Sequence, residues 1–371
     1  MVFLIILMFL FSLYAILILY YWLAWKSVPE YVPAIASPEI KISVIIPARN
    51  EEENIGHLLT ALQQQTYPAH LFEIIVVDDH STDSTATIVR QFSSVKLLQL
   101  KEDNINSYKK KAIETGVAAA TGELIVTTDA DCIPAKEWLQ TIASFKQERN
   151  SVFVAAPVVL NCNSSVVQIF QTMDFMILQG ITGASVHKNI HSMCNGANLA
   201  YERKVFHAVN GFAGIDNIAS GDDMLLMHKI WKQEPGKVHY LKSKAAIVST
   251  KPMTTWKAFF NQRIRWASKA KNYDDKRIIA VLLLVYIFNF SFLGLLVSGF
   301  WCSQYWLYFL LMWVAKTIVE IPFFISVSSF FNKQWAVKFF FFFQPLHIFY
   351  TIISGLFGQL GKYEWKGRKV S

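Results

Sequence analysis

The sequence predicts an α/β domain with a mostly parallel sheet, carried between apolar segments that are long enough to cross a membrane. Short β-branched runs alternate with helix-like stretches between residues 26 and 277, the pattern of parallel strands joined by helical crossovers. The 371 residues are 53% hydrophobic and only 17% charged, whereas an average soluble domain carries roughly 25% charged residues. The composition therefore argues against a purely soluble protein.

The first element is an apolar segment at residues 1–25, which contains no charged residue. Its length matches the ~20 residues that cross the core of a bilayer. A cleavable signal peptide would need a basic start, a shorter apolar stretch and a small-residue cleavage site, and none of these precedes Lys26. We expect a membrane anchor.

The polar block that follows reads as alternating strands and helices. Strands are expected at residues 41–47, 72–77, 95–100 and 123–127, and helices at 51–65, from about 84 to 92, and at 109–120. In parallel sheets of this kind, ligands bind beyond the carboxyl ends of the strands. Polar clusters fall at those ends, at residues 48–53, 78–83 and 129–131.

The turn after the first strand contains no glycine, which argues against a dinucleotide-binding domain. Any bound phosphate must then be neutralised by a metal ion or by cationic side chains. Asp129 and Asp131 share one loop after an apolar strand, and two carboxylates so placed can hold a hard divalent cation. The four scattered cysteines support neither a zinc site nor a disulfide framework.

Three more apolar segments follow, at residues 278–300, 304–326 and 336–358, and a basic tail occupies 359–371. Residues 251–277 look like an interfacial amphipathic segment. In the third segment Lys316 and Glu320 are spaced i, i+4, which predicts a structural ion pair. Four crossings would separate the tail from the polar block, so one segment is expected to be re-entrant or interfacial, with Pro322 and Pro345 as candidate breaks.

The net charge of +8 reflects the membrane flanks more than a nucleic-acid surface, because residues 278–371 hold seven Lys/Arg against two Glu. No nucleic-acid partner is expected. Basic residues also border the polar block on both sides, so the positive-inside rule places it in the cytoplasm and the chain in the inner or plasma membrane. These flanking residues are Lys26, Lys41, Lys269, Lys271, Lys276 and Arg277.

Six motifs together resemble the membrane-bound family 2 glycosyltransferases with a GT-A fold. They are SVIIPARNEEENI, EIIVVDDHSTDST, GELIVTTDADC, NGANLAYERKVF, SGDDMLL and QRIRW. The resemblance covers residues 41–270 and is strongest to the group related to cellulose, chitin and hyaluronan synthases. It implies a cytosolic GT-A nucleotide-diphospho-sugar transferase domain at residues 26–250, held between transmembrane helices at both ends.

The resemblance also implies a donor site. Pro47, Glu51 and Asp79 would hold the nucleoside of a nucleotide-diphosphate sugar, and Lys109 or Lys110 would approach the donor. Lys111 continues the same lysine run, so the sequence leaves this assignment open.

Further roles follow from the same resemblance. Asp129 and Asp131 would position Mg²⁺ or Mn²⁺ against the diphosphate. Asp223 would be the general base, supported by Asp222, where the family usually has Glu; capping of a helix is the simpler alternative for this acid pair.

The QRIRW motif matches the family's Gln-x-x-Arg-Trp pattern. In it Arg265 would contact the diphosphate, while Gln262 and Trp266 would bind the acceptor. An interfacial anchor is the simpler alternative here, and both roles can coexist on one helix.

Transfer from a nucleoside diphosphate creates a negative leaving group, which a divalent cation and an arginine can stabilise. An acceptor hydroxyl needs a base, and a single base with direct displacement predicts inversion at the anomeric carbon. Three hypotheses remain: a polysaccharide synthase, a single-transfer enzyme acting on a polyprenyl phosphate or a membrane lipid, and a catalytically silent scaffold. The acids at 79, 129, 131 and 223 argue against the scaffold.

Overall fold

The computed structural model describes residues 2–33, 39–103, 105–162, 165–190, 193–218, 221–269, 275–359, 363–365 and 368–370. The chain forms two compact units. The sheet unit comprises Val28–Asn161 and Ser185–Lys251; the helical unit comprises Met1–Ser27, Cys162–Ala184 and Pro252–Ser371. Residues 162–184, which fall inside the predicted domain 26–250, therefore group with the apolar helices.

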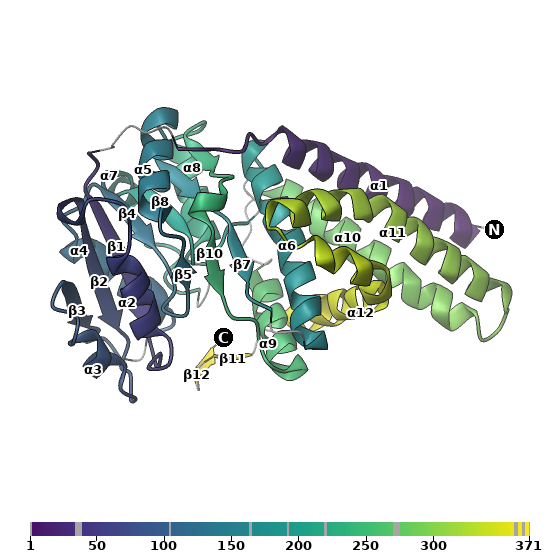
Figure 1. Cartoon of the computed structure of the whole chain (residues 1–371). Helices are drawn as coiled ribbons and strands as arrows, with labels where there is room; N and C mark the ends of the chain where they lie inside the picture. The colour runs from purple at the N-terminus through teal and green to yellow at the C-terminus, as the bar shows by residue number, and fades with distance from the viewer. Residues whose placement is uncertain are drawn as a thin grey trace. The chain divides into compact units, whose positions relative to one another are not determined.

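A seven-stranded sheet forms the centre of the sheet unit, in the order β3-β2-β1-β4-β8-β6-β9 (Figure 1). Only β8 runs antiparallel to its neighbours, so the predicted mostly parallel sheet is confirmed. The inner strands are buried along nearly their whole length, which explains their continuous apolar runs. The bounds are β1 (Ile42–Ala48), β2 (Phe72–Asp78), β3 (Val95–Gln99), β4 (Leu124–Thr127), β6 (Phe153–Ala155), β8 (Leu199–Glu202) and β9 (Val238–Tyr240).

The register of the sheet brings the predicted polar clusters to one edge. β1 pairs in parallel with β2, from Ile42 opposite Phe72 to Ala48 opposite Asp78. It also pairs in parallel with β4, from Ile42 opposite Leu124. The carboxyl ends of all three strands therefore point the same way, and the loops after them are neighbours.

Helices and a small second sheet complete this unit. The helix predicted at 51–65 begins at Ile55, because the residues before it form a turn bonded to the loop after β2. The small sheet has the order β5-β10-β7, with β5 (Ile133–Pro134), β10 (Val248–Thr250) and β7 (Val158–Leu160). The helices are α2 (Ile55–Gln63), α3 (Thr85–Val89), α4 (Tyr108–Ala119), α5 (Trp138–Arg149), α7 (Arg203–Ala208) and α8 (Met224–Gln233), with short 3-10 turns η1 (Ala69–Leu71) and η2 (Lys244–Ala246).

Among the described residues, the helical unit contains four stretches long and apolar enough to cross a membrane: Val2–Ser27, Lys276–Ser298, Gln304–Phe330 and Gln334–Gly358. They agree with the four apolar segments predicted from the sequence. The helices of this unit are α1 (Val2–Ser27), α6 (Val166–His187, which extends past the unit boundary), α9 (Trp256–Ala267), α10 (Lys276–Ser298), α11 (Gln304–Phe330), η4 (Gln334–Phe339) and α12 (Phe340–Gly358), followed by the strands β11 (Tyr363–Trp365) and β12 (Arg368–Val370).

A buried polar cluster links three of these helices. Lys316 Nζ on α11 lies 2.6 Å from Glu320 Oε1 and donates to Gln344 Oε1 of α12 at 2.6 Å. Tyr14 of α1 donates its hydroxyl to Glu320. The side chain of Lys316 is 0% exposed. The predicted i, i+4 ion pair is therefore confirmed, and it carries two further partners that the sequence pattern did not reveal.

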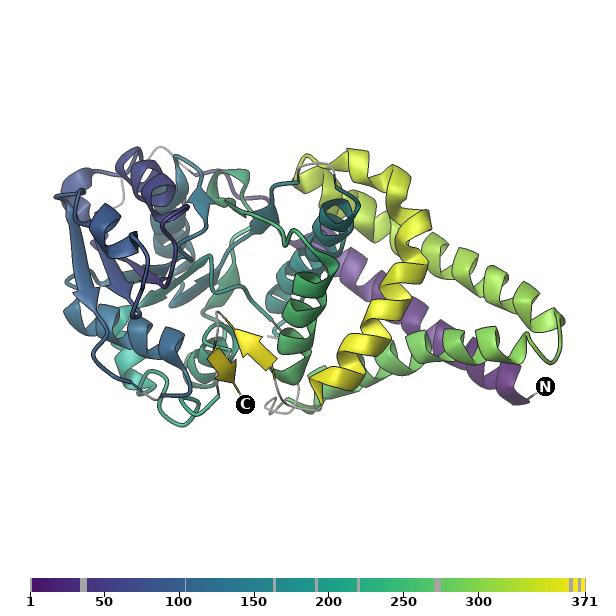
Figure 2. The ribbon, with the colours of Figure 1, turned by 90° about the horizontal axis from the view of Figure 1, so that it is seen from below.

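The last helix, α12, runs across the long helices rather than alongside them (Figure 2). Phe340 near its start stacks on Phe324 of α11, with ring centroids 4.6 Å apart. Gly358 at its end packs against Ala267 of α9. Both α11 and α12 are continuous through their prolines, Pro322 and Pro345, so neither proline breaks a helix.

Candidate active site

The loops after β1 and β2 are hydrogen-bonded to each other. This brings together three residues that were predicted to bind the nucleotide-sugar donor. Arg49 NH1 donates to the carbonyl oxygens of Asp79 at 2.7 Å and of His80 at 3.2 Å. The Glu51 amide donates to Thr85 Oγ1 at 2.8 Å. Pro47 lies at the end of β1, level with Val77 on β2. Pro47, Glu51 and the nearly buried Asp79 therefore belong to one wall.

Sequence reasoning missed Arg49, although it lies between Pro47 and Glu51. Its guanidinium holds the turn in which His80 adopts a left-handed backbone, with φ of 52°. The imidazole of that turn bridges two acids: Nδ1 lies 3.0 Å from Asp79 Oδ1, and Nε2 lies 3.2 Å from Asp103 Oδ1. A cation beside an acidic strand end was the signal that could have marked Arg49.

The three consecutive lysines of α4 have three different environments. Lys109 Nζ lies 2.7 Å from Asp129 Oδ1 and 3.2 Å from Asp222 Oδ2. Lys110, 1% exposed, donates instead to the carbonyl oxygens of Ile215 and Ile218. The third, Lys111, pairs with Glu102 at 3.2 Å. Lys109 is thus the lysine of this run that contacts the predicted site acids.

The charge around Lys109 is strongly acidic. Burial by itself lowers the pKa of a lysine, but the carboxylates of Asp129, then Asp222 and Asp223, outweigh it and raise the pKa of Lys109 well above its usual range. This side chain is therefore a fixed cation between the Asp-x-Asp loop and the acid pair before α8.

The Asp-x-Asp loop follows β4 at the same sheet edge. The Asp129 carboxylate is 35% exposed and already binds one cation, the ammonium of Lys109. Within the described residues there is no group of three or more His, Cys, Asp or Glu side chains that could enclose a metal ion. The metal role of Asp129 and Asp131 therefore stays a prediction, in which water and substrate phosphate would supply the other ligands, as Mg²⁺ usually requires.

The neighbouring thiol is not a metal ligand in this arrangement. Cys132 is buried, and its Sγ lies 3.5 Å from Asp131 Oδ1. Burial, followed by the charges of Asp131 and Asp129, raises the pKa of the Cys132 thiol well above its usual range. All four cysteines are free, in agreement with the prediction that they form no disulfide framework.

The acid pair lies at the start of α8, as the sequence pattern indicated. Asp223 accepts a hydrogen bond from the Met224 amide at 2.7 Å and caps the helix. Asp222 instead turns its carboxylate to Lys109. The two acids thus have different surroundings: Asp223 caps α8, and Asp222 pairs with Lys109.

Gly196 is a further site residue that sequence reasoning did not single out. A Cβ at this position would lie 2.9 Å from Asp222 Oδ2 and 3.1 Å from Lys109 Nζ. Thr127, the last residue of β4, donates its hydroxyl to the carbonyl oxygen of Gly196 at 3.3 Å. The glycine of the NGAN sequence therefore lets the lysine and the acid approach each other.

The QRIRW motif lies in the helical unit, on α9. Gln262, Arg265 and Trp266 are all partly buried, whereas Arg263 is buried. Arg263 NH2 lies 2.6 Å from Asp174 Oδ2 of α6. The predicted contacts of Arg265 with a diphosphate and of Gln262 and Trp266 with an acceptor stay predictions.

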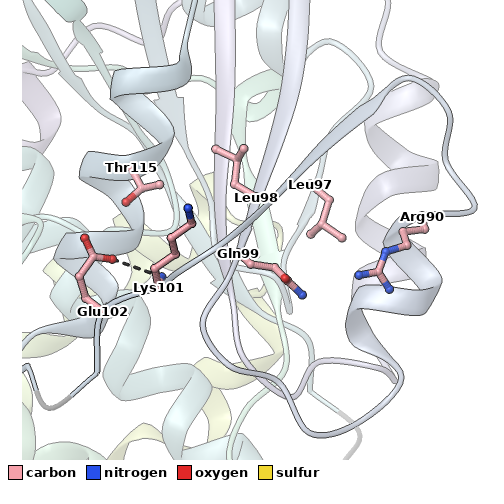
Figure 3. A pocket seen from close by; sticks show the side chains of 7 residues that line it. All are labelled: Arg90, Leu97, Leu98, Gln99, Lys101, Glu102 and Thr115. Carbon is pink, nitrogen blue, oxygen red and sulfur yellow. Dashed lines mark hydrogen bonds between the residues drawn. The ribbon is translucent and has the colours of Figure 1, made fainter.

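A surface hollow of about 720 Å³ lies beside the edge strand β3 and contains none of the predicted site residues (Figure 3). Its lining includes Leu98, Gln99 and Thr115. The backbone amide of Lys101 donates to the Glu102 carboxylate there at 3.3 Å. The hollow belongs to the edge of the sheet, and no residue of the acidic loops after β1, β2 and β4 lines it.

The mostly parallel sheet with an Asp-x-Asp loop at its carboxyl edge defines a GT-A-like domain. Residues 43–209 match the family described as Glycosyl transferase family 2.

Two curated relatives are similar over part of their length. The probable glycosyltransferase YdaM of Bacillus subtilis (strain 168) is 30% identical over 234 residues, covering 61% of this chain and 54% of that protein. Glycosyltransferase AglE of Haloferax volcanii is 39% identical over 103 residues, covering 27% of this chain and 33% of AglE. The chain thus spans about half or less of the length of these relatives.

A solved structure shares the fold. It is the mannosyltransferase PcManGT from Pyrobaculum calidifontis in complex with GDP-Man and Mn²⁺, with a TM-score of 0.54 and 19% identity. The alignment covers 93% of this chain and 96% of that one. At 19% identity the likeness shows the fold alone and does not identify the substrate of this chain.

Proposed function

We propose that this protein is an integral-membrane inverting glycosyltransferase that moves a sugar from a nucleotide-diphosphate donor to a saccharide or lipid acceptor. The observation that carries the proposal is the Lys109 ammonium, which contacts both Asp129 and Asp222. This contact puts the Asp-x-Asp loop and the acid pair around one cationic point. Chemistry at a diphosphate needs that combination, because positive charge must meet the leaving group close to the base.

The donor is assigned to the edge formed by the loops after β1, β2 and β4. Pro47, Glu51 and Asp79 would hold the nucleoside, and Asp129 and Asp131 would hold Mg²⁺ or Mn²⁺. A bound divalent ion would neutralise the charge that develops on the diphosphate as the sugar leaves. PcManGT, which shares the fold, was solved with GDP-Man and Mn²⁺.

Asp223 is proposed as the base that takes the proton of the acceptor hydroxyl. Asp222 is already paired with Lys109, whereas Asp223 uses Oδ1 for the Met224 amide. The support for Asp223 is its place in the acid pair before α8, where its charge also acts on Lys109. With one base and direct displacement, the product has the inverted anomeric configuration.

The acceptor and the diphosphate would also meet residues of α9. Arg265 is proposed to contact the diphosphate, and Gln262 and Trp266 the acceptor. A flat indole can stack on the apolar face of a sugar while an amide donates to its hydroxyls. These roles rest on the motif pattern.

Of the two enzymatic alternatives, one structural observation favours a single transfer to a lipid acceptor. The side chains of Lys316, Glu320 and Gln344 bond to one another where α11 meets α12. With Tyr14 of α1 bonded to Glu320, this cluster ties α1, α11 and α12 together rather than lining a path for a sugar chain. A polysaccharide synthase would therefore need helices from elsewhere, while a lipid acceptor needs only the membrane surface.

A donor panel tests the proposal. Membranes containing the protein would be incubated with radiolabelled UDP- and GDP-sugars, with Mn²⁺, with Mg²⁺, or with EDTA. We expect transfer from one donor that EDTA abolishes and Mn²⁺ or Mg²⁺ restores. A singly modified lipid supports the lipid acceptor, and a ladder of products supports the polysaccharide synthase. Transfer that persists in EDTA contradicts the metal role of Asp129 and Asp131, and no transfer from any donor supports the silent scaffold.

A further inference from the structure

Arg263 occupies a variable position of the Gln-x-x-Arg-Trp pattern, yet it is the most buried residue of the QRIRW motif. Arg263 is 4% exposed, and its partner Asp174 on α6 is equally buried. NH2 of Arg263 lies 2.6 Å from Asp174 Oδ2. The hydroxyl of Tyr350 on α12 donates to the other oxygen of Asp174. One carboxylate therefore ties α9, α6 and α12 together.

The same guanidinium reaches the two residues proposed to bind the acceptor. Its NH1 donates to Gln262 Oε1 at 3.1 Å, which fixes the orientation of that amide. Its central carbon lies 4.2 Å from the centroid of the Trp266 ring, a close cation–π contact. A second ring, Phe259, lies under the guanidinium at 4.9 Å. Arg263 thus contacts Asp174 of α6 and both residues proposed to bind the acceptor, Gln262 and Trp266.

This geometry requires arginine rather than any cation. A planar guanidinium can direct NH2 at Asp174 and NH1 at Gln262 while its face lies on an indole. A lysine ammonium is a point charge, which can keep the ion pair but cannot hold both contacts in that plane. Burial of the pair also means that removal of either charge leaves the other uncompensated in an apolar setting.

We propose that Asp174 and Arg263 are positioning residues for the acceptor, which set the orientation of Gln262 and Trp266 without touching the reacting atoms. This inference rests on the proposed function of Gln262 and Trp266. It adds a residue of α6, Asp174, that no motif contains. The pair lies within the helical unit, on two helices, α6 and α9, that are not among the candidate membrane spans.

Two variants test the pair with little change in side-chain size. Arg263→Lys retains the charge opposite Asp174, and Asp174→Asn retains a hydrogen-bond acceptor for Arg263. Arg277→Lys is the matched control, because Arg277 also pairs with an aspartate, Asp275, but on an exposed surface at the start of α10. Thermal unfolding of the full chain in lipid nanodiscs identifies any variant that has lost its structure.

The first readout does not depend on catalysis. The full chain is labelled with 5-fluorotryptophan, and the resonance of Trp266 is assigned with Trp266→Phe. We expect Arg263→Lys and Asp174→Asn to move the Trp266 resonance, and Arg277→Lys to leave it unchanged. An unmoved Trp266 resonance in both variants, with the fold retained, would overturn the proposal.

The second readout is kinetic and uses the donor and the acceptor identified by the panel. We expect the acceptor KM to rise about tenfold or more in Arg263→Lys, which corresponds to the loss of one hydrogen bond to a charged group. The donor KM should stay within about twofold, as expected when only acceptor contacts are lost. A rise in donor KM alone contradicts acceptor positioning. If Trp266 moves as expected but the wild-type chain transfers no sugar, the positioning stands and the proposed function fails.

Discussion

The acids at the sheet edge differ in what they contact, and this difference separates their roles. Asp129 and Asp222 share the Lys109 ammonium, while Asp223 caps α8. Two aspartates that lie about 90 residues apart in the chain, Asp129 and Asp222, thus meet at one lysine. Two predictions follow at the scale of single residues.

Asp223→Asn removes the proposed base and keeps the helix cap, because asparagine caps helices about as well as aspartate. We expect transfer to fall by roughly 10² to 10⁴, the usual contribution of a general base, with donor binding nearly unchanged. Transfer rates and equilibrium binding of the donor measure the two effects. Asp216→Asn, at an exposed acid of the same unit, is the control that should stay active. A fully active Asp223→Asn enzyme would sink the assignment of the base.

Lys109→Met removes the cation that both acids contact. We expect the donor KM to rise about 10- to 100-fold, the effect of losing a hydrogen bond to a charged group. Lys111→Met is the matched control on the same helix, because Lys111 pairs with Glu102 at the surface and exposed pairs contribute little. Donor saturation curves for the two variants give the comparison. Equal effects of the two substitutions would show that Lys109 has no special part in donor binding.

At the scale of elements, buried polar contacts hold the apolar helices in a fixed arrangement. Lys316 and Glu320 of α11 are bonded to Tyr14 of α1 and Gln344 of α12. Asp174 performs the same task for α6, α9 and α12. Apolar helix surfaces contact lipid as readily as they contact another helix, so they do not select a neighbouring helix. The buried polar clusters therefore specify which helices pack together.

Glu320→Gln leaves the Lys316 ammonium buried without a carboxylate. We expect the free energy of unfolding to fall by about 3 to 5 kcal/mol, the usual result of removing one partner of a buried pair. The double variant Lys316→Met/Glu320→Gln should recover part of this loss, since no unpaired charge remains. Thermal unfolding in nanodiscs gives the order of stability. A Glu320→Gln protein as stable as wild type would mean that the pair does not hold α11 in place.

At the scale of the whole molecule, the path of α12 bears on which side of the membrane the basic tail lies. The end of α11 contacts the end of α1, through Phe330 and Trp25, whose ring centroids are 5.5 Å apart. The start of α12 stacks on Phe324, near that same end, and its last residue, Gly358, packs on Ala267, shortly before α10 begins. The helix also contacts Trp313 of α11 and Tyr286 of α10, and it runs across the long helices (Figure 2), which fits an interfacial position better than a crossing.

We therefore expect three crossings, with the tail on the same side of the membrane as the sheet unit. Green fluorescent protein fused after Ser371 should fluoresce, because it folds on the cytoplasmic side. Alkaline phosphatase inserted after Cys302, in the exposed turn between α10 and α11, should be active on the opposite side. The reverse pattern, an active phosphatase at the C-terminus, would instead support four crossings. Within the tail itself, residues 360–362, 366, 367 and 371 lie outside the described part of the structure.

Much of the fold was predictable because its signals are local. β-branched runs, the i, i+3, i+4 spacing of Ile55, Leu58 and Leu59, and long apolar segments each depend on neighbouring residues. The boundary of α2 was predicted four residues too early, because the turn before it is fixed by hydrogen bonds from a loop about 30 residues further on. Such contacts leave no periodic trace in the sequence.

The sequence by itself determined the class of fold, the apolar segments and the acids at the strand ends, since these follow from residue type and spacing. Only the tertiary structure decided which of three adjacent lysines reaches Asp129, that Gly196 gives it room, and that Asp174 holds Arg263. It also decided the course of α12. Each of these depends on the direction of a side chain or helix relative to parts far away in the chain, and packing alone sets that direction.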